Sequence, residues 1–225
     1  MKLQGGPSLT DRNLSFAAAE YVWDSPESAG SHQSIVPLAI RILRQHNAES
    51  VLDLGCGNGA LTAELQRAGF QMSGCDMSES GIALARAHYP QIPFFQQDLS
   101  DPLPKAHAGQ YDAVISIEVI EHLLLPRFLI ESAVRALRMG GVFVLSTPFH
   151  GYWKNLALAL TNKFDSHWHP MRDFGHVKFF SKKTLSALLR ERELQVRRIH
   201  TVGRVPPLAR NMVLEAVKPG GLLSQ

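Results

Sequence analysis

The chain has 225 residues, of which 45% are hydrophobic and 19% charged, and its formal net charge is +3. This length suits one globular domain with a sizeable core. No apolar run approaches the roughly 18 residues that a membrane span needs, and the first residues lack the apolar core of a secretory signal. These features exclude an integral membrane protein, and we expect a cytoplasmic protein with, at most, peripheral membrane contact.

The mild excess of basic residues and the two cysteines indicate which partners and which redox compartment to expect. The basic residues of the segment 182–198 alternate with acidic and apolar residues and lack interleaved aromatics. This pattern favours a solvated face over a nucleic-acid surface, so we expect no nucleic-acid partner. Cys56 and Cys75 fall at the ends of neighbouring predicted strands. We expect two free thiols, as in a reducing compartment.

In chain order, strand and helix patterns alternate. The expected strands cover residues 50–54, 71–75, 93–96, 111–117 and 142–146, and the expected helices cover residues 60–68, 81–88 and 127–138. Ser78 is the expected N-cap of the second helix, and Gly140-Gly141 should end the third. This alternation predicts a doubly wound α/β fold with helices on both faces of a mainly parallel sheet.

The two ends of the chain flank this core. Ile35, Leu38, Ile42 and Leu43 predict a helix, which we place over the carboxyl edge of the sheet, with simple packing as the alternative. After the fifth strand the alternation stops; Ser181 then caps a helix to about residue 192, and two strands form an antiparallel pair. The expected single domain divides into an N-terminal cap (1–48), a core of alternating strands and helices (49–148), an insertion (149–180) and a C-terminal helix and strand pair (181–225).

The most informative motif is the glycine-rich string between the first strand and the first helix, Asp53-Leu54-Gly55-Cys56-Gly57-Asn58-Gly59. Glycines permit a tight turn, so backbone amides at a helix N-terminus can approach a ligand closely. By itself this string also fits NAD enzymes.

Three further segments carry side chains that could bind the same ligand as the glycine-rich string. Asp76 closes the second strand, where it can accept hydrogen bonds from a ribose. Asp98-Leu99 follows the third strand and suits an adenine ring. Tyr111-Asp112 opens the fourth strand, and residues 117–123 close it. We expect these segments at one edge of the sheet, where ligands bind in doubly wound folds.

Together these residues resemble the class I S-adenosylmethionine-dependent methyltransferases over residues 50–148. Gly74-Cys75-Asp76-Met77 and the string Glu118-Val119-Ile120-Glu121-His122-Leu123 look most like the ubiquinone-biosynthesis O-methyltransferase branch and its small-molecule relatives. The resemblance implies a Rossmann-like seven-stranded sheet of order 3-2-1-4-5-7-6. The membrane-associating segment of the quinone enzyme is not recognisable in residues 151–163.

The resemblance also implies a site for the cofactor S-adenosyl-L-methionine, so we expect residues 49–148 to be the cofactor-binding core and residues 149–180 to be an acceptor lid insertion. The residues of the cofactor site would be Tyr21, Asp53, Gly55, Cys56, Gly57, Asp76, Met77, Asp98, Leu99 and Glu118. In this interpretation Asp76 holds the ribose, Met77 and Leu99 flank the adenine, and Glu118 lies near the methionine end. The alternative for Asp53 is a role in tying the loop, and for Met77 and Leu99 a place in the core.

Methyl transfer from a sulfonium is an in-line displacement, so a general base is needed only for a hydroxyl or a protonated amine. His176 is our preferred base, with His122 and His169 as further candidates, since imidazole accepts protons near neutral pH. Packing or surface roles are the alternatives. Asp165, His167, His169 and Asp173 match no strong metal motif, so we expect no metal there.

We therefore predict a methyltransferase that acts on a hydroxyl of a small, aromatic or quinone-like acceptor, as a monomer or homodimer. The alternatives are an N-methyltransferase, a sugar methyltransferase, a nicotinamide oxidoreductase or a non-catalytic nucleotide-binding module. The intact acidic positions Asp76 and Asp98 argue against the last of these.

Overall fold

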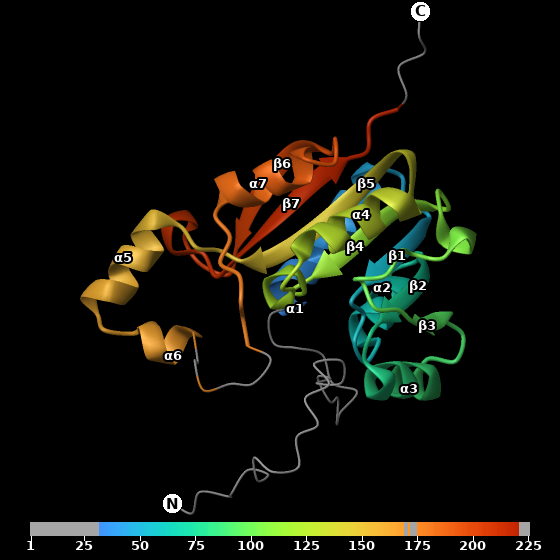
Figure 1. Ribbon diagram of the computed structural model, residues 1–225, viewed down its shortest axis with the longest axis horizontal. Helices are drawn as coiled ribbons and strands as arrows, with labels where there is room; N and C mark the ends of the chain where they lie inside the picture. Colours follow the sequence, from blue (N-terminus) through green and yellow to red (C-terminus); the bar gives the residue numbers. More distant parts are fainter. Residues whose placement is uncertain (1–31, 169–170, 172–174, 221–225) are drawn as a thin grey trace, which may run out of the picture.

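The protein is built around one mixed sheet of seven strands, covered by helices on both faces (Figure 1). The computed structural model describes residues 32–168, 171 and 175–220. The strand order is β3-β2-β1-β4-β5-β7-β6. The strands are β1 (Ser50–Leu54), β2 (Gln71–Asp76), β3 (Phe94–Gln96), β4 (Tyr111–Ile117), β5 (Leu137–Pro148), β6 (Gln195–Val202) and β7 (Asn211–Val217). The predicted fold class and strand order are confirmed.

Two layers of helices bury the two faces of the sheet. The helices are α1 (His32–Gln45), α2 (Ala60–Arg67), α3 (Glu79–His88), α4 (Pro126–Ala136), α5 (Tyr152–Leu160), α6 (Phe164–Trp168) and α7 (Lys182–Arg190). One core joins the sheet to α4 and α7, and a second joins it to α1, α2 and α3. Because both faces are covered, the carboxyl ends of the parallel strands are the exposed part of the sheet to which loops bring functional groups.

The parallel strands are apolar along their length because both of their faces are buried. Val114 and Ile115 of β4 are fully buried on opposite faces. β7 runs antiparallel to β5 and β6, and it inserts between them as the resemblance implied. The predicted antiparallel C-terminal pair is therefore confirmed.

The boundary between α4 and β5 differs from the prediction. The helix ends at Ala136, not near residue 138, and Leu137 already pairs with Tyr111. Gly140-Gly141 therefore lies within the strand, where the register between β4 and β5 shifts, and the Gly140 N–H donates to the Lys218 carbonyl. The local pattern favoured a longer helix. Strand pairing and the complete burial of Leu137 stabilise the extended conformation instead.

The predicted placement of α1 over the carboxyl edge is wrong. Ile35, Ile42 and Leu43 are fully buried against one face of the sheet, within the same core as α2 and α3. The apolar stripe of α1 fits an apolar sheet surface, and an edge formed by loops offers less apolar area to cover it. The packing alternative is therefore the one that the structure supports.

The segment after β5 forms two short helices that extend away from the sheet (Figure 1). Several apolar side chains on α5 are exposed, including Tyr152, Trp153 and Leu160, whereas Lys154 is buried. Among the described residues, helices of a length and apolarity sufficient to cross a bilayer are absent.

Candidate functional site

The glycine loop turns tightly after β1 and is fixed by the end of β2. The N–H groups of Gly55 and Cys56 both donate to the Cys75 carbonyl, at 2.8 and 3.0 Å. Gly55 has a φ of 85°, and a Cβ there would lie 2.5 Å from Cγ2 of Val119. Both facts require glycine at this position. Cys56 and Cys75 are buried free thiols, as predicted.

Asp76 joins the glycine loop to the start of α3. Its Oδ2 accepts the Gly57 N–H at 2.8 Å, and its Oδ1 accepts the Ser78 N–H at 2.9 Å. Ser78 in turn caps α3 by accepting the Gly81 N–H. The carboxylate therefore orders the loop. Each carboxylate oxygen has two lone pairs, so the predicted hydrogen bonds to a ribose are compatible with these contacts.

Asp53 is a buried carboxylate under the glycine loop. Its Oδ2 accepts the Thr62 hydroxyl at 2.7 Å, while its Oδ1 is buried without a hydrogen-bond partner. Burial raises the pKa of this carboxyl to about 7, the Thr62 hydrogen bond lowers it, and the Asp76 charge raises it further. Asp53 thus ties α2 to β1, and the oxygen without a partner is suited to a water or ammonium donor.

The residues predicted at the adenine differ in their surroundings. Met77 is 49% exposed, so it does not belong to the core and is free to cover a ligand. Leu99 is buried within the larger core, in line with its packing alternative. Asp98 is exposed, and its Oδ1 accepts the Ser100 N–H at 2.8 Å. Their roles at an adenine ring stay predictions.

Glu118 sits in a strained turn directly after β4. Its φ is 58°, a left-handed conformation that residues other than glycine rarely adopt and that is often found at functional sites. The carboxylate accepts hydrogen bonds from Ser146 and Asn211. Burial raises the pKa of Glu118 to about 7, although both hydrogen bonds and the positive charge of Lys154 lower it.

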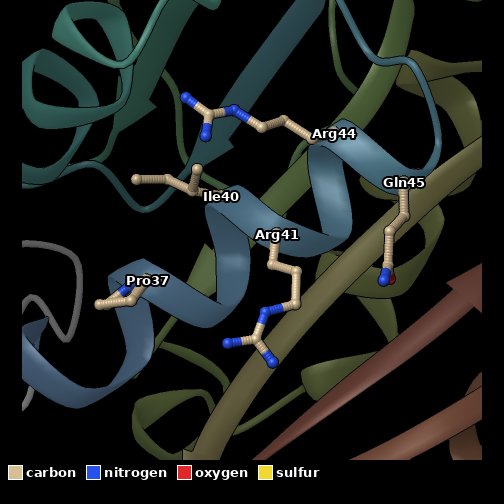
Figure 2. Close-up of a pocket in the computed structure, with 5 residues that line it drawn as sticks. All are labelled: Pro37, Ile40, Arg41, Arg44 and Gln45. Carbon is tan, nitrogen blue, oxygen red and sulfur yellow. The ribbon is translucent and has the colours of Figure 1, made fainter.

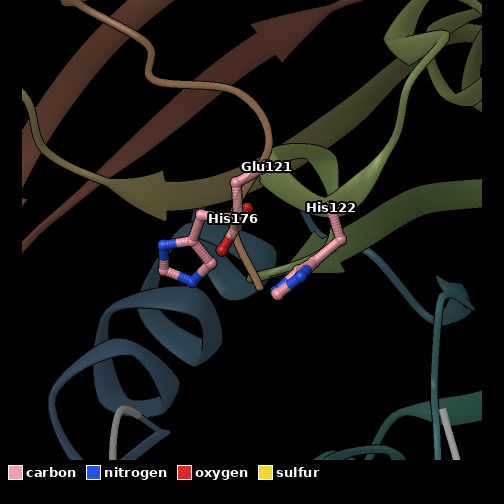
Figure 3. Close-up of side chains that lie close together, drawn as sticks. All are labelled: Glu121, His122 and His176. Atoms are coloured by element: carbon pink, nitrogen blue, oxygen red, sulfur yellow. The ribbon is translucent and has the colours of Figure 1, made fainter. Parts of the chain in front are cut away.

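Glu121, His122 and His176 form a compact cluster beside this turn (Figure 3). The first two lie in the 3₁₀ turn Ile120–His122, and the two imidazole rings meet edge to face at 4.9 Å between their centroids. The Glu121 Oε2 accepts the Thr147 hydroxyl, while its Oε1 is buried without a partner. Burial, and then the charge of Glu118, raise the pKa of Glu121 well above its ordinary value.

Comparisons with known proteins identify the family. A family model described as a methyltransferase domain matches residues 33–199. The chain belongs to this methyltransferase family. Accordingly, it is an enzyme that uses S-adenosylmethionine.

Relatives and solved structures agree with this assignment. A ubiquinone biosynthesis O-methyltransferase of Hydrogenovibrio crunogenus is 28% identical over 176 residues, which cover 75% of this chain and 73% of the relative. Its counterpart from Pseudomonas aeruginosa is 27% identical over 189 residues, covering 81% and 82%. In fold, the methyltransferase is similar to magnesium protoporphyrin IX methyltransferase from Synechocystis with bound SAH (TM-score 0.64, 21% identity, 84% of each chain).

Aromatic side chains of the segment after β5 pack against one another and against His150. Trp168 packs against Phe179 at 5.0 Å between ring centroids, and Phe179 meets the ring of His150 edge to face at 5.1 Å. Burial, followed by the charge of Lys154, lowers the pKa of His150 to about 4. Tyr21 and His169 lie outside the described residues, so their predicted roles stay predictions.

Two parts of the methyltransferase lie away from this site. Asp112 accepts the N–H groups of Glu49 and Ser50 and pairs with Arg138 at 2.7 Å, at the amino edge of the sheet, so its predicted place with the other motifs is wrong. A residue that opens a parallel strand lies opposite the carboxyl edge. A pocket of about 440 Å³ lies beside α1, and its lining residues are labelled in Figure 2. It is lined by Pro37, Ile40, Arg41, Arg44 and Gln45, which are not predicted site residues.

Glu121 belongs to this cluster, although its sequence position alone predicted no role for it. It stands three residues after Glu118 and directly before His122, within the string that carried the family resemblance. Carboxylates at this spacing beside a histidine are a signal that could have drawn attention to it. Its burial and its contact with His176 depend on the tertiary structure.

Proposed function

We propose that this methyltransferase transfers a methyl group to a hydroxyl oxygen of a small aromatic acceptor. The observation that carries the proposal is the cluster of Glu121, His122 and His176 at the end of β4, next to Glu118. An O-acceptor needs a group that takes or stabilises its proton, whereas a nucleophile without a proton needs alignment alone. In this proposal, the cluster supplies that group and His176 is the first candidate.

The surroundings of the cluster support an aromatic acceptor. Trp168, Phe179 and His150 provide ring faces and edges on the side of the insertion, and such rings favour stacked or edge-to-face contacts with another ring. The two relatives described above, from Hydrogenovibrio crunogenus and Pseudomonas aeruginosa, are named ubiquinone biosynthesis O-methyltransferases, which is consistent with this acceptor class. The acceptor lid (149–180) is part of this proposal.

The test is a methyl-transfer assay with labelled S-adenosylmethionine and three acceptors: a catechol carboxylate, the matching aromatic diamine and a free sugar. We expect a mass gain of one methyl group on the catechol. His176→Ala should reduce turnover by about 10²- to 10⁴-fold while the affinity for S-adenosylhomocysteine is unchanged. His88→Ala, on the exposed side of α3, is the matched control.

The other outcomes separate the alternatives. Methylation of the diamine or the sugar alone would replace the O-acceptor with the N-methyl or sugar alternative. Saturable binding of S-adenosylhomocysteine without transfer to any acceptor would favour a non-catalytic module. Full turnover in His176→Ala would remove that residue as the base.

A further inference from the structure

Helix α5 exposes aromatic side chains and buries a lysine. Tyr152 and Trp153 are 73% and 62% exposed, whereas Lys154 is only 8% exposed. Amphipathic helices of globular proteins normally place apolar residues inside and charged residues outside. Burial of an ammonium group costs free energy unless an anion or several hydrogen-bond acceptors compensate it. A residue that breaks a local rule at such a cost is expected at functional sites, so Lys154 is a candidate ligand-binding residue.

The described protein groups compensate the Lys154 ammonium only in part. Its Nζ donates a hydrogen bond to the Arg210 carbonyl at 3.3 Å, and that carbonyl also accepts the Phe149 N–H at 2.8 Å. An ammonium has three N–H donors. The ion pairs formed within the described part of the chain do not include Lys154. The lysine therefore keeps donors that a ligand could use.

The charges around Lys154 are mainly positive. Burial, followed by the charge of Arg204, lowers the pKa of Lys154 to about 8; the charge of Glu118 raises it, and that of Arg210 lowers it further. Both arginines are exposed, and they lie in the connection between β6 and β7, which packs against α5. Neighbouring cations destabilise one another, so an anion bound at Lys154 would stabilise the group.

The carboxylate of Glu118 does not fill this role. It already accepts hydrogen bonds from Ser146 and Asn211, and it forms no ion pair with Lys154 among the described residues. Its charge acts on Lys154 from a longer distance and leaves the pKa of the lysine below its ordinary value. The missing anion is therefore to be sought outside the described protein groups.

Lys154 lies at the carboxyl edge of the sheet, where an acceptor is expected. Its hydrogen-bond partner Arg210 directly precedes β7, which pairs there with the end of β5. Burial and then the charge of Lys154 lower the pKa of His150, and the charge of His176 makes a smaller contribution in the same direction. Lys154 and His150 are therefore close to the histidine that we propose as the base.

Aromatic rings next to His150 offer a surface for a ring-shaped ligand. Phe179 meets the ring of His150 edge to face at 5.1 Å, and Trp168 packs on Phe179 at 5.0 Å between ring centroids. The Trp168 Nε1–H is buried, and it has no hydrogen-bond acceptor among the described residues. A ligand ring could pack on these side chains while its oxygen atoms accept hydrogen bonds.

We propose that Lys154 binds a carboxylate group of the acceptor, so that this methyltransferase acts on aromatic acids. The inference rests on the proposed function for the aromatic ring and adds the charged group. A carboxylate supplies the anion and the acceptor oxygens that the buried ammonium lacks, and such charge-assisted hydrogen bonds are strong. The exposed Arg204 and Arg210 would attract the anion toward the buried lysine.

The test uses two unreactive ligands that differ in charge but have nearly the same shape, 3,4-dimethoxybenzoate and 3,4-dimethoxybenzamide. Calorimetry on the complex with S-adenosylhomocysteine should show that the acid binds at least about tenfold more tightly than the amide. Lys154→Met, which removes the charge and keeps the length, should abolish this preference, and Lys154→Arg should retain it. Lys163→Gln, at an exposed lysine of the same insertion, is the matched control. Unaltered S-adenosylhomocysteine affinity shows that the variants are folded.

A pH series provides a second measurement. Since the pKa of Lys154 is about 8, binding of the acid to wild type should weaken by up to about 15-fold between pH 8 and pH 9.5. The two nearby groups Glu118 and His150 have pKa values of about 7 and about 4, so they titrate mainly below this range. Arginine keeps its proton throughout, so the profile of Lys154→Arg should be flatter than that of wild type.

The outcomes keep the carboxylate site and the proposed function apart. Equal binding of the acid and the amide by wild type, or a preference that persists in Lys154→Met, would overturn the role of Lys154. A preference that depends on Lys154, without methyl transfer to 3,4-dihydroxybenzoate, would support the site and contradict the proposed function. Methyl transfer to catechol and to 3,4-dihydroxybenzoate with equal kcat/KM would support the proposed function and refute the carboxylate assignment.

Discussion

Replacement of Asp53 by asparagine should change how the stability of the protein depends on pH. Burial is the main cause that raises the pKa of Asp53 from its ordinary 3.8 to about 7. Between these two values the unfolded chain has lost a proton that the folded protein keeps. The stability contributed by this group therefore falls as pH rises through this window, and it is constant above about pH 8.

The size of the effect follows from the two pKa values. A shift of about three units corresponds to about 4 kcal/mol in all, of which about 2.6 kcal/mol is lost between pH 5 and pH 8. Asp53→Asn removes the titration, while its amide oxygen can still accept the Thr62 hydroxyl. Its amide nitrogen would replace the oxygen without a partner, at a cost of about 1 to 3 kcal/mol that does not depend on pH.

The assay is urea denaturation of the ligand-free protein at pH 5, 6, 7 and 8. The free energy of unfolding of Asp53→Asn minus that of wild type should rise by about 2.6 kcal/mol across this range, since the other titrating groups are shared. Thr62→Val is the control with the opposite effect. Loss of the Thr62 hydrogen bond should raise the pKa of Asp53 further, so the fall in the free energy of unfolding should extend to higher pH. Parallel pH profiles for wild type and Asp53→Asn would refute the argument that Asp53 is held protonated by burial.

Three further substitutions test the loop and the fold. Asp76→Ala should weaken S-adenosylhomocysteine binding by about 1 to 3 kcal/mol in calorimetry, through loss of charge-assisted hydrogen bonds; unchanged affinity would place the ribose elsewhere. Gly55→Ala should lower the urea midpoint and cofactor affinity together, because its Cβ would clash with Val119; a midpoint equal to wild type would contradict the clash. Ser181→Ala should cost about 1 kcal/mol of stability without changing cofactor affinity, because it removes the capping box with Thr184; retained stability would show that the cap contributes little.

The elements that were predicted well are those whose signals are local. The strand, glycine turn and helix at residues 50–67 follow one another directly, and their boundaries agree with the prediction to within a residue. The Ser181 cap was also recognisable, because the serine and the helix it starts are adjacent. By contrast, residues 137–141 read locally as the end of a helix, but the pairing of Leu137 with Tyr111 of β4 and the backbone hydrogen bonds to Lys218, just after β7, make them strand.

The sequence by itself determined the order of the strands and helices along the chain, the glycine loop and the acid at the end of β2. These features depend on backbone conformations and on spacings within short stretches of chain. Only the tertiary structure decided which histidine meets Glu121, because backbone hydrogen bonds from Val177 and Lys178 bring a distant segment to that turn. It also decided that the carboxylates of Asp53 and Glu121 are buried with an oxygen left without a partner. Burial depends on how separated segments pack, which spacing along the chain does not specify.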